Sequence, residues 1–167
     1  MNKIELLNGR GQIGAFLKER LKHRIFEIKI CVYHTWNIED KSGEAQSLEY
    51  DKFKKFVNNN KYKKIIFIST NSQKETAYVK YKQICESFLI ENCENCLILR
   101  FPTLIGKGIF YDFKDNSKKP QGEMEIMSIQ EACKNIIDNI EYDGYIKIKS
   151  FEGHKIKAEL IYELVRL

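Results

Sequence analysis

The chain has 167 residues, of which 43% are hydrophobic and 31% charged, and 28 basic against 23 acidic side chains give it a net charge of +5. These values are those of one ordinary globular domain with a core of its own. No block of five like charges and no apolar run near the roughly 20 residues that cross a bilayer is present, so neither nucleic acid nor a membrane is an expected partner.

Strand-like and helix-like segments alternate along the chain. Strands are predicted over residues 3–9, 26–36, 63–70, 96–102 and 144–151. Helices are predicted over residues 13–24, 47–60, 73–91, 128–140 and 157–167. A polar, glycine-containing loop is predicted over residues 103–123. The alternation predicts an α/β fold, a Rossmann-like parallel sheet with helices on both faces, in one domain over residues 1–167.

A glycine motif joins the first strand to the first helix, where Gly9, Gly11 and Gly14 are spaced as G-x-G-x-x-G. Such a turn lets backbone N–H groups and the helix N-terminus approach a pyrophosphate, although it can also serve only close packing of helix and strand. The acidic residue that binds a ribose about 20 residues further on is missing, since residues 30–35 read ICVYHT. Arg10 could reach the extra phosphate of NADP or be an exposed side chain, so NAD and NADP both stay open.

Tyr78 and Lys82 lie four residues apart in a predicted helix and therefore on one face of it. A tyrosine ordinarily loses its proton near pH 10, and a neighbouring ammonium lowers the pKa. Tyr78 could then exchange a proton with a substrate hydroxyl or carbonyl. Thr70, at the end of the preceding strand, could hold the same oxygen.

The same spacing recurs at Tyr50 and Lys54, where no hydroxyl-rich strand precedes it. The spacing alone is therefore also that of an ordinary amphipathic helix. Ser72 and Glu75 further match a capping box, which predicts a structural role for Ser72. Only the order of buried strand, hydroxyls and helix favours Tyr78 over Tyr50.

Five cysteines, an odd number, predict reduced thiols and a cytoplasmic location, and the start of the chain has no signal-peptide pattern. Cys93 and Cys96 form one CxxC without further ligands, so a helix end turning into a strand is expected there, and no metal. His34 could line a site at a strand end or be an ordinary core or surface residue. Trp36 could belong to the core or cover a ligand.

Four segments in order, LLNGRGQIGAFL, KKIIFISTNS, AYVKYKQICE and LILRFPTLIGKG, resemble the short-chain dehydrogenase/reductases of the extended, nucleotide-sugar type, among them the dehydrorhamnose reductases. The resemblance implies that Tyr78 exchanges the proton, that Lys82 contacts the nicotinamide ribose and that Thr70 fills the Ser/Thr position. The cofactor-binding residues that it implies are Gly9, Arg10, Gly11, Gln12, Ile13, Gly14, Lys82 and Pro102.

The chain departs from this family in three ways. Residues 26–36 resemble the family's fourth strand, so the second and third strands, which cradle the adenosine, are expected to be absent. Asn71 and Ser72 replace the acids of the sugar dehydratases, which disfavours dehydration. Residues 103–167 would contain only a vestigial substrate-binding region, with Phe110, Tyr111 and Phe113 either gripping the substrate or anchoring the loop.

The resemblance implies an NAD(P)-dependent oxidoreductase or epimerase that acts on a nucleotide-linked sugar in bacterial surface-polysaccharide synthesis. The alternative is a catalytically inactive module of the same origin that binds a dinucleotide, a nucleotide or a partner protein. A third reading is a subunit whose site another chain completes, because an open sheet edge invites pairing and a homodimer would supply it.

Overall fold

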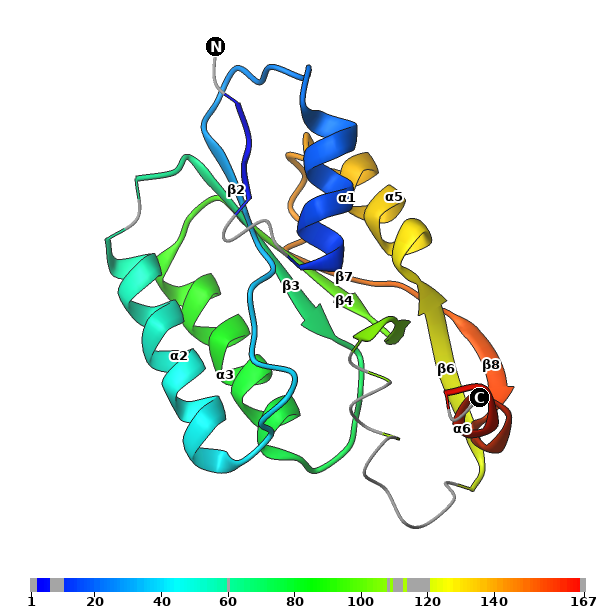
Figure 1. The fold of residues 1–167 in the computed structure, drawn as a ribbon. Helices are drawn as coiled ribbons and strands as arrows, with labels where there is room; N and C mark the ends of the chain where they lie inside the picture. The colour runs from blue at the N-terminus through cyan, green and yellow to red at the C-terminus, as the bar shows by residue number, and fades with distance from the viewer. Residues whose placement is uncertain are drawn as a thin grey trace.

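The computed structural model describes residues 3–6, 11–59, 61–107, 109, 113 and 121–165. Its centre is a five-stranded parallel sheet in the order β1-β2-β3-β4-β7 (Figure 1). The strands are β1 (Glu5–Leu6), β2 (Ile30–Tyr33), β3 (Lys64–Thr70), β4 (Cys96–Phe101) and β7 (Ile148–Ser150). The expected α/β fold with a parallel sheet is confirmed.

Helices cover both faces of this sheet because strand side chains alternate between two cores. On one face Val32 and Ile66 pack with Leu17 of α1 (Gln12–Leu21) and with α5 (Ile129–Asn139). On the other face Cys31 and Phe67 pack with Phe53 of α2 (Gly43–Asn58) and with α3 (Ala77–Asn92). All six of these core side chains are fully buried.

The strand order has an unusual consequence for the first connection. β1, β2, β3 and β4 are neighbours in sequence order, yet α1 lies on the face opposite to α2 and α3 (Figure 1). The β1–α1–β2 connection therefore has the opposite hand to the two that follow, whereas about 98% of such connections are right-handed. In doubly wound sheets the strand order reverses beside the first strand, and the ligand binds in the crevice at that point. Among the described residues no strand lies on the outer side of β1, in agreement with the expected loss of two strands.

A second, three-stranded sheet follows the first. It contains β5 (Thr103–Ile105), β6 (Glu123–Ser128) and β8 (His154–Lys157), with β5 parallel and β8 antiparallel to β6, and α6 (Ala158–Val165) follows it. The loop prediction for residues 103–123 was wrong at both ends, and β6 and β8 were not predicted at all. Apart from the buried Ile126 and Met127, their residues are half-exposed or exposed, and charged residues stand at alternate positions, so the apolar signal is weak.

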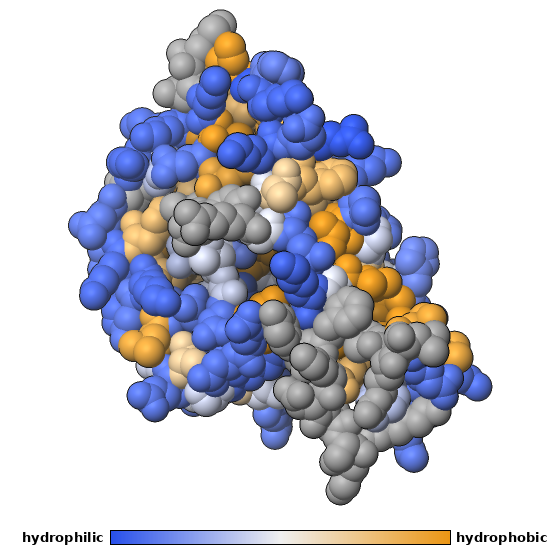
Figure 2. Space-filling view, in the orientation of Figure 1, coloured by the Kyte–Doolittle hydropathy of each residue, from blue (hydrophilic) through white to orange (hydrophobic). Residues whose placement is uncertain are grey.

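A small core joins this sheet to α6. Phe113 is buried in it and meets the ring of Tyr162 edge-on, with centroids 6.0 Å apart. Phe110 and Tyr111 lie outside the described residues. Figure 2 shows hydrophilic side chains over most of the visible face and apolar ones gathered along α5 and β6. In the part of the chain that the structure describes, every helix is too short or too polar to span a bilayer.

The start of α3 differs from the predicted one. The helix begins at Ala77, and Thr76 caps it by accepting a hydrogen bond from the N–H of Val79 at 3.2 Å. The capping box at Ser72 was therefore wrong: its hydroxyl accepts from the N–H of Lys74, in a non-helical segment. This later start places Tyr78 in the first turn of α3.

Candidate functional site

The carboxyl ends of the parallel strands meet at one edge of the sheet, where ligands of open α/β sheets bind. His34 and Trp36 follow β2 at this edge, and Thr70 ends β3. α3 returns from the same edge and contributes Tyr78 in its first turn and Lys82 one turn later. The fold therefore gathers the three predicted catalytic residues at the carboxyl edge.

Lys82 is directed into the protein and is only 4% exposed. Its Nζ donates a hydrogen bond to the carbonyl of Ile68 at 2.8 Å and lies 4.2 Å from the ring centroid of Trp36 and 4.7 Å from that of Phe67. Burial lowers the pKa of Lys82 to about 7, because removing the ammonium from water disfavours its charge. The two ring faces attract the ammonium and oppose part of this effect.

Tyr78 is half-buried between two lysines. Its ring centroid lies 5.9 Å from Nζ of Lys82 and 5.8 Å from Nζ of Lys41. Both ammonium groups, together with the positive end of the α3 dipole, favour negative charge at this side chain. The ring of Tyr78 and Nζ of Lys82 therefore lie near each other, and Lys41 adds a cation that sequence reasoning missed.

Thr70 ends the strand to which Lys82 is bonded. Its hydroxyl oxygen accepts a hydrogen bond from the N–H of Ser72 at 3.1 Å, so the hydroxyl hydrogen points elsewhere and can be donated. The next residue, Asn71, donates its side-chain amide to the carbonyl of Phe151 at 3.1 Å. These bonds fix the chain between β3 and α3.

Trp36 covers Lys82 and is itself held in place. Its Nε1 donates to Oε1 of Gln46 at 2.7 Å. Gln46 is fully buried, and its Nε2 donates to the carbonyls of Asn37 and Asp40 at 3.1 and 2.7 Å. Of the two roles considered for Trp36, the structure shows packing against the core: the indole lies against the core beneath α2 and over the ammonium of Lys82.

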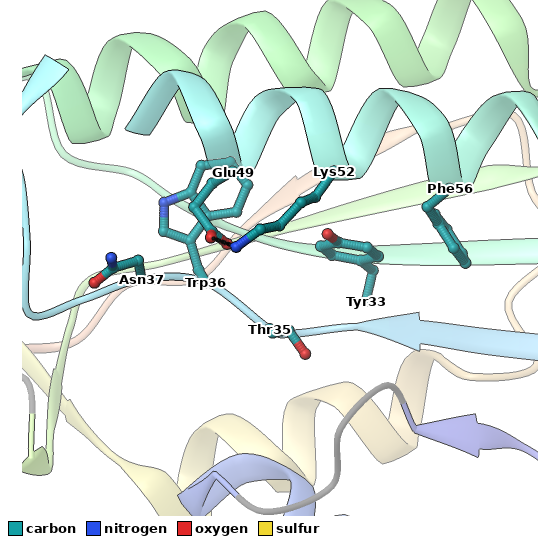
Figure 3. Close-up of a pocket in the computed structure, with 7 residues that line it drawn as sticks. All are labelled: Tyr33, Thr35, Trp36, Asn37, Glu49, Lys52 and Phe56. Atoms are coloured by element: carbon teal, nitrogen blue, oxygen red, sulfur yellow. Dashed lines mark hydrogen bonds and ion pairs between the residues drawn. The ribbon is translucent and has the colours of Figure 1, made fainter. Parts of the chain in front are cut away.

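An open pocket of about 600 Å³ lies beside the indole, between the end of β2 and α2 (Figure 3). Its volume is within the usual range for small-molecule sites. The lining residues are Tyr33, Thr35, Trp36, Asn37, Glu49, Lys52 and Phe56. Sequence reasoning missed this pocket because the residue pattern of α2 does not indicate that a space remains between this helix and the end of β2.

His34 carries a buried polar atom at the same edge. Among the described residues its Nε2 has no hydrogen-bond partner. Burial, with a smaller contribution from the charge of Lys82, lowers the pKa of His34, so the imidazole is neutral at pH 7. Such an orphaned atom can be satisfied by a bound ligand or by water.

The glycine turn is described from Gly11 onward, and Gly9 and Arg10 lie outside the described residues. Gly11 is the N-cap of α1 in an extended conformation, without a side-chain cap, and Gly14 is buried. The first N–H groups of α1, including those of Gln12 and Ile13, therefore have no side chain of the cap to bind and face the carboxyl edge. This arrangement fits a phosphate group.

Two more predicted cofactor residues have structural contacts. Oε1 of Gln12 accepts a hydrogen bond from the N–H of Lys107 at 2.9 Å, which ties the start of α1 to the segment after β5. Pro102 is buried at the end of β4, and a Cβ added to Gly153 would lie 2.8 Å from its Cγ. The carboxyl edge thus presents the N-terminus of α1 and the ends of β2, β3 and β4, and among the described residues no strand lies on the outer side of β1.

A buried ion pair supports α3 one turn beyond Lys82. Glu86 is 3% exposed, and its carboxylate accepts two hydrogen bonds from Nε of Arg100 at 3.0 and 3.1 Å, a further one from Nη2, and one from the hydroxyl of Ser69. These bonds to Glu86 raise the pKa of Arg100. They fasten α3 to β3 and β4 beneath the site.

Comparisons with known proteins give structural likeness only. No protein-family model and no curated protein matches the chain. The Bordetella bronchiseptica enzyme WbmG in complex with NAD and UDP is 13% identical with a TM-score of 0.67, over 98% of this chain and 77% of that one. A dTDP-4-dehydrorhamnose reductase from Clostridium acetobutylicum is 16% identical with a TM-score of 0.67, over 99% and 81%.

A third solved structure is the capsular polysaccharide assembling protein CapF from Staphylococcus aureus. It is 16% identical with a TM-score of 0.61, over 99% of this chain and 58% of that one. These neighbours are extended short-chain dehydrogenase/reductases. The chain therefore has the Rossmann-like fold of that group, in a form with fewer strands.

Proposed function

We propose that the protein is an NAD(P)-dependent oxidoreductase or epimerase that acts on a nucleotide-linked sugar. The observation that carries this proposal is the position of Tyr78, in the first turn of α3, with the ammonium of Lys82 5.9 Å from its ring at the carboxyl edge. The fold supports it, since a neighbour of the same fold is a complex with NAD and UDP. Thr70 stands at the end of the adjoining strand.

Each residue of the candidate site has a separate role in the proposed reaction. The N–H groups at the start of α1, after Gly11, would hold a phosphate of the cofactor, and Pro102 would lie beside its nicotinamide. A bound nicotinamide supplies or accepts the hydride. Tyr78 gives a proton to the sugar oxygen or takes one from it, and Thr70 donates a hydrogen bond to that oxygen. The ammonium form of Lys82, which predominates only below the pKa of about 7, contributes positive charge that stabilises the phenolate.

The neighbours and the thiols support the proposed substrate class and setting. WbmG is a complex with UDP, and CapF is a capsular polysaccharide assembling protein, which supports a nucleotide-linked sugar and surface-polysaccharide synthesis. Asn71 and Ser72 in place of acids favour reduction or epimerisation over dehydration. Five free cysteines favour a reducing compartment, for which we propose the cytoplasm.

Turnover of nucleotide-linked sugars tests the proposal. Purified protein is incubated with UDP- and dTDP-linked sugars and with NAD, NADH, NADP or NADPH, while absorbance at 340 nm and the sugar products are followed. Tyr78→Phe is expected to lower kcat by about 10²–10⁴-fold, the usual contribution of acid–base catalysis. Tyr50→Phe is the matched control, because Tyr50 has the same spacing to Lys54 but packs against Tyr81 and Phe88. Equal effects of the two changes, or none, contradict the proposal.

One observation favours a second candidate, a module that binds a nucleotide without turnover. The indole of Trp36 lies over the ammonium of Lys82, and Gln46 holds it there. A ribose that is to contact Lys82 must first displace this indole. Under this candidate, calorimetry detects binding of UDP, dTDP or NADH, and no sugar turns over with any cofactor.

We also propose that the protein forms a homodimer through the outer surface of α2 and α3. A groove there is lined by Tyr50, Lys80, Gln83, Ile84, Ser87, Phe88 and Glu91. In a two-fold symmetric dimer the same surface patch of each copy contacts that patch of the other, so this groove can pack against its own copy. Light scattering after size exclusion should give twice the chain mass, and Phe88→Glu should return it to the mass of one chain.

A further inference from the structure

The pocket between the end of β2 and α2 is lined by charged and aromatic side chains that no step of the proposed reaction uses. The indole of Trp36 lies at one end of it and the ring of Phe56 at the other (Figure 3). Tyr33 lies between them, and its ring centroid is 5.0 Å from that of Phe56. Such walls suit a flat, aromatic ligand, because nucleobases and other rings stack favourably on aromatic side chains.

A nearly buried carboxylate faces this space from α2. The side chain of Glu49 is 7% exposed, whereas that of Lys52, three residues later, is 68% exposed. Oε1 of Glu49 accepts a hydrogen bond from Nζ of Lys52 at 2.6 Å, and both residues line the pocket (Figure 3). Among the described residues, Oε2 of Glu49 accepts no hydrogen bond. A buried carboxylate oxygen ordinarily has a donor, so Oε2 remains for a donor from outside the chain.

Glu49 and Lys52 together form an ordered array of hydrogen-bonding groups. The ammonium can donate to an oxygen, and the carboxylate beside it can accept from two N–H groups at once. One edge of guanine carries the matching order: a carbonyl oxygen, a ring N–H and an amino group. Uracil and thymine place a second carbonyl where guanine has its amino group, and it would oppose the carboxylate. Adenine and cytosine have a ring nitrogen lone pair in place of the ring N–H, so among these bases guanine alone matches the array.

The loop beside the array is held in place before a ligand binds. Oδ1 of Asn37 accepts hydrogen bonds from the N–H groups of Glu39 and Asp40 at 3.0 and 2.9 Å. Gln46 bonds to the indole of Trp36 at 2.7 Å and to the carbonyls of Asn37 and Asp40. Because these contacts already fix the aromatic wall, a ligand loses little affinity to the ordering of this loop.

We propose that this pocket binds the guanine ring of a nucleotide. Glu49 accepts from the ring N–H and the amino group, Lys52 donates to the carbonyl oxygen, and Trp36 and Phe56 are the aromatic walls. The inference goes beyond the proposed function, because binding of the ring needs neither the nicotinamide cofactor nor Tyr78. The ring belongs to a free guanine nucleotide or to one linked to a sugar.

Calorimetric titration of the full chain with GDP tests the proposal without any cofactor or turnover. We expect saturable binding, and the fluorescence of Trp36, the only tryptophan, should change with the same midpoint. Inosine diphosphate lacks the amino group and should bind at least about tenfold more weakly, since it loses a hydrogen bond to a charged group. Excess ADP or UDP should leave GDP bound. Displacement by either one, equal affinity for inosine diphosphate, or no saturable binding of GDP overturns the proposal.

Glu49→Gln gives a readout that a loss of folding cannot imitate. The amide keeps an acceptor for the ring N–H but sets a donor against the amino group, so GDP should bind at least about tenfold more weakly. Xanthosine diphosphate carries a carbonyl in place of that amino group, so the variant should bind it more tightly than GDP. Asp51→Asn is the matched control, because Asp51 pairs with Lys54 at the same spacing but is half-exposed. A Glu49→Gln protein that still prefers GDP, or an equal loss in Asp51→Asn, contradicts the assignment.

A comparison of GDP with GDP-mannose distinguishes the two sources of the ring. Tighter binding of GDP-mannose makes the ring part of a nucleotide-linked sugar, and tighter binding of GDP makes it that of a free nucleotide. Glu49→Gln should weaken both ligands in either case. A variant that weakens neither overturns the proposal and leaves the proposed reaction untouched, since that reaction is measured by turnover.

Discussion

The buried ammonium of Lys82 makes the stability of the fold depend on pH in a predictable way. In the folded protein its pKa falls from 10.5 to about 7, while the unfolded chain keeps the ordinary value. Between these values the unfolded chain binds a proton that the folded protein has lost, so stability rises as the pH rises. The full effect corresponds to about 5 kcal/mol, and the part between pH 7 and pH 8.5 to about 2 kcal/mol.

Lys82→Met removes this contribution while keeping a side chain of similar length. At pH 7 the variant should be at least as stable as the wild type, because burying the ammonium costs free energy that methionine avoids. The advantage should shrink by about 2 kcal/mol by pH 8.5, where the wild-type lysine is neutral. The buried thiols, whose pKa values are also shifted, are present in both proteins and cancel in the difference.

Urea unfolding followed by circular dichroism at pH 7, 7.5, 8 and 8.5 measures this difference. Lys80→Met is the control, since Lys80 is exposed on the same helix and should give a difference independent of pH. If the difference between wild type and Lys82→Met is also constant with pH, the ammonium keeps its proton. The rings of Trp36 and Phe67, with the carbonyl of Ile68, would then fully compensate its burial.

Three further predictions concern the scaffold. Glu86→Gln should lower the free energy of unfolding by about 1–3 kcal/mol in urea titrations, because it removes the charged partner of the partly exposed Arg100. Gly153→Ala should lower it by about 1–3 kcal/mol, since the added Cβ would collide with the backbone of Ile126, whereas Gly106→Ala should cost less because it meets only a flexible side chain. Phe53→Ala should cost about 3–5 kcal/mol in the same titrations, because its fully buried ring fills the core beneath α2. Equal losses in the two glycine variants, or a neutral Phe53→Ala, would contradict the packing described.

The main sheet was predictable because its central strands have a clear apolar pattern in the sequence. β3 and β4 are almost wholly buried, so both appear as continuous apolar runs and were predicted within one residue at each end. β6 and β8 lie at the surface with charges along them, and a short half-exposed strand leaves little apolar pattern. α3 was started too early because Ser72 and Glu75 match a capping box, whereas Asn71 bonds across to Phe101 and Phe151 and keeps that segment out of the helix.

The site was predictable only where it depends on spacing within one element. Tyr78 and Lys82 are one helical turn apart, so their proximity follows from the sequence. The indole over Lys82 depends on Trp36, Gln46 and α3 meeting in space, and no local pattern encodes that contact.

Binding of a reduced dinucleotide tests the central claim, that the N-terminus of α1 at the carboxyl edge holds the phosphates of a nicotinamide cofactor. A side chain at Gly11 meets nothing within 4 Å, so Gly11→Asp and Gly11→Asn both fit and both supply a helix cap. Only the aspartate repels a phosphate. Titration of NADH and NADPH, followed by energy transfer from Trp36 to the nicotinamide, should saturate in the wild type, weaken modestly in Gly11→Asn and vanish in Gly11→Asp. Absence of saturable binding in the folded wild type, or equal binding by the two variants, would contradict the account.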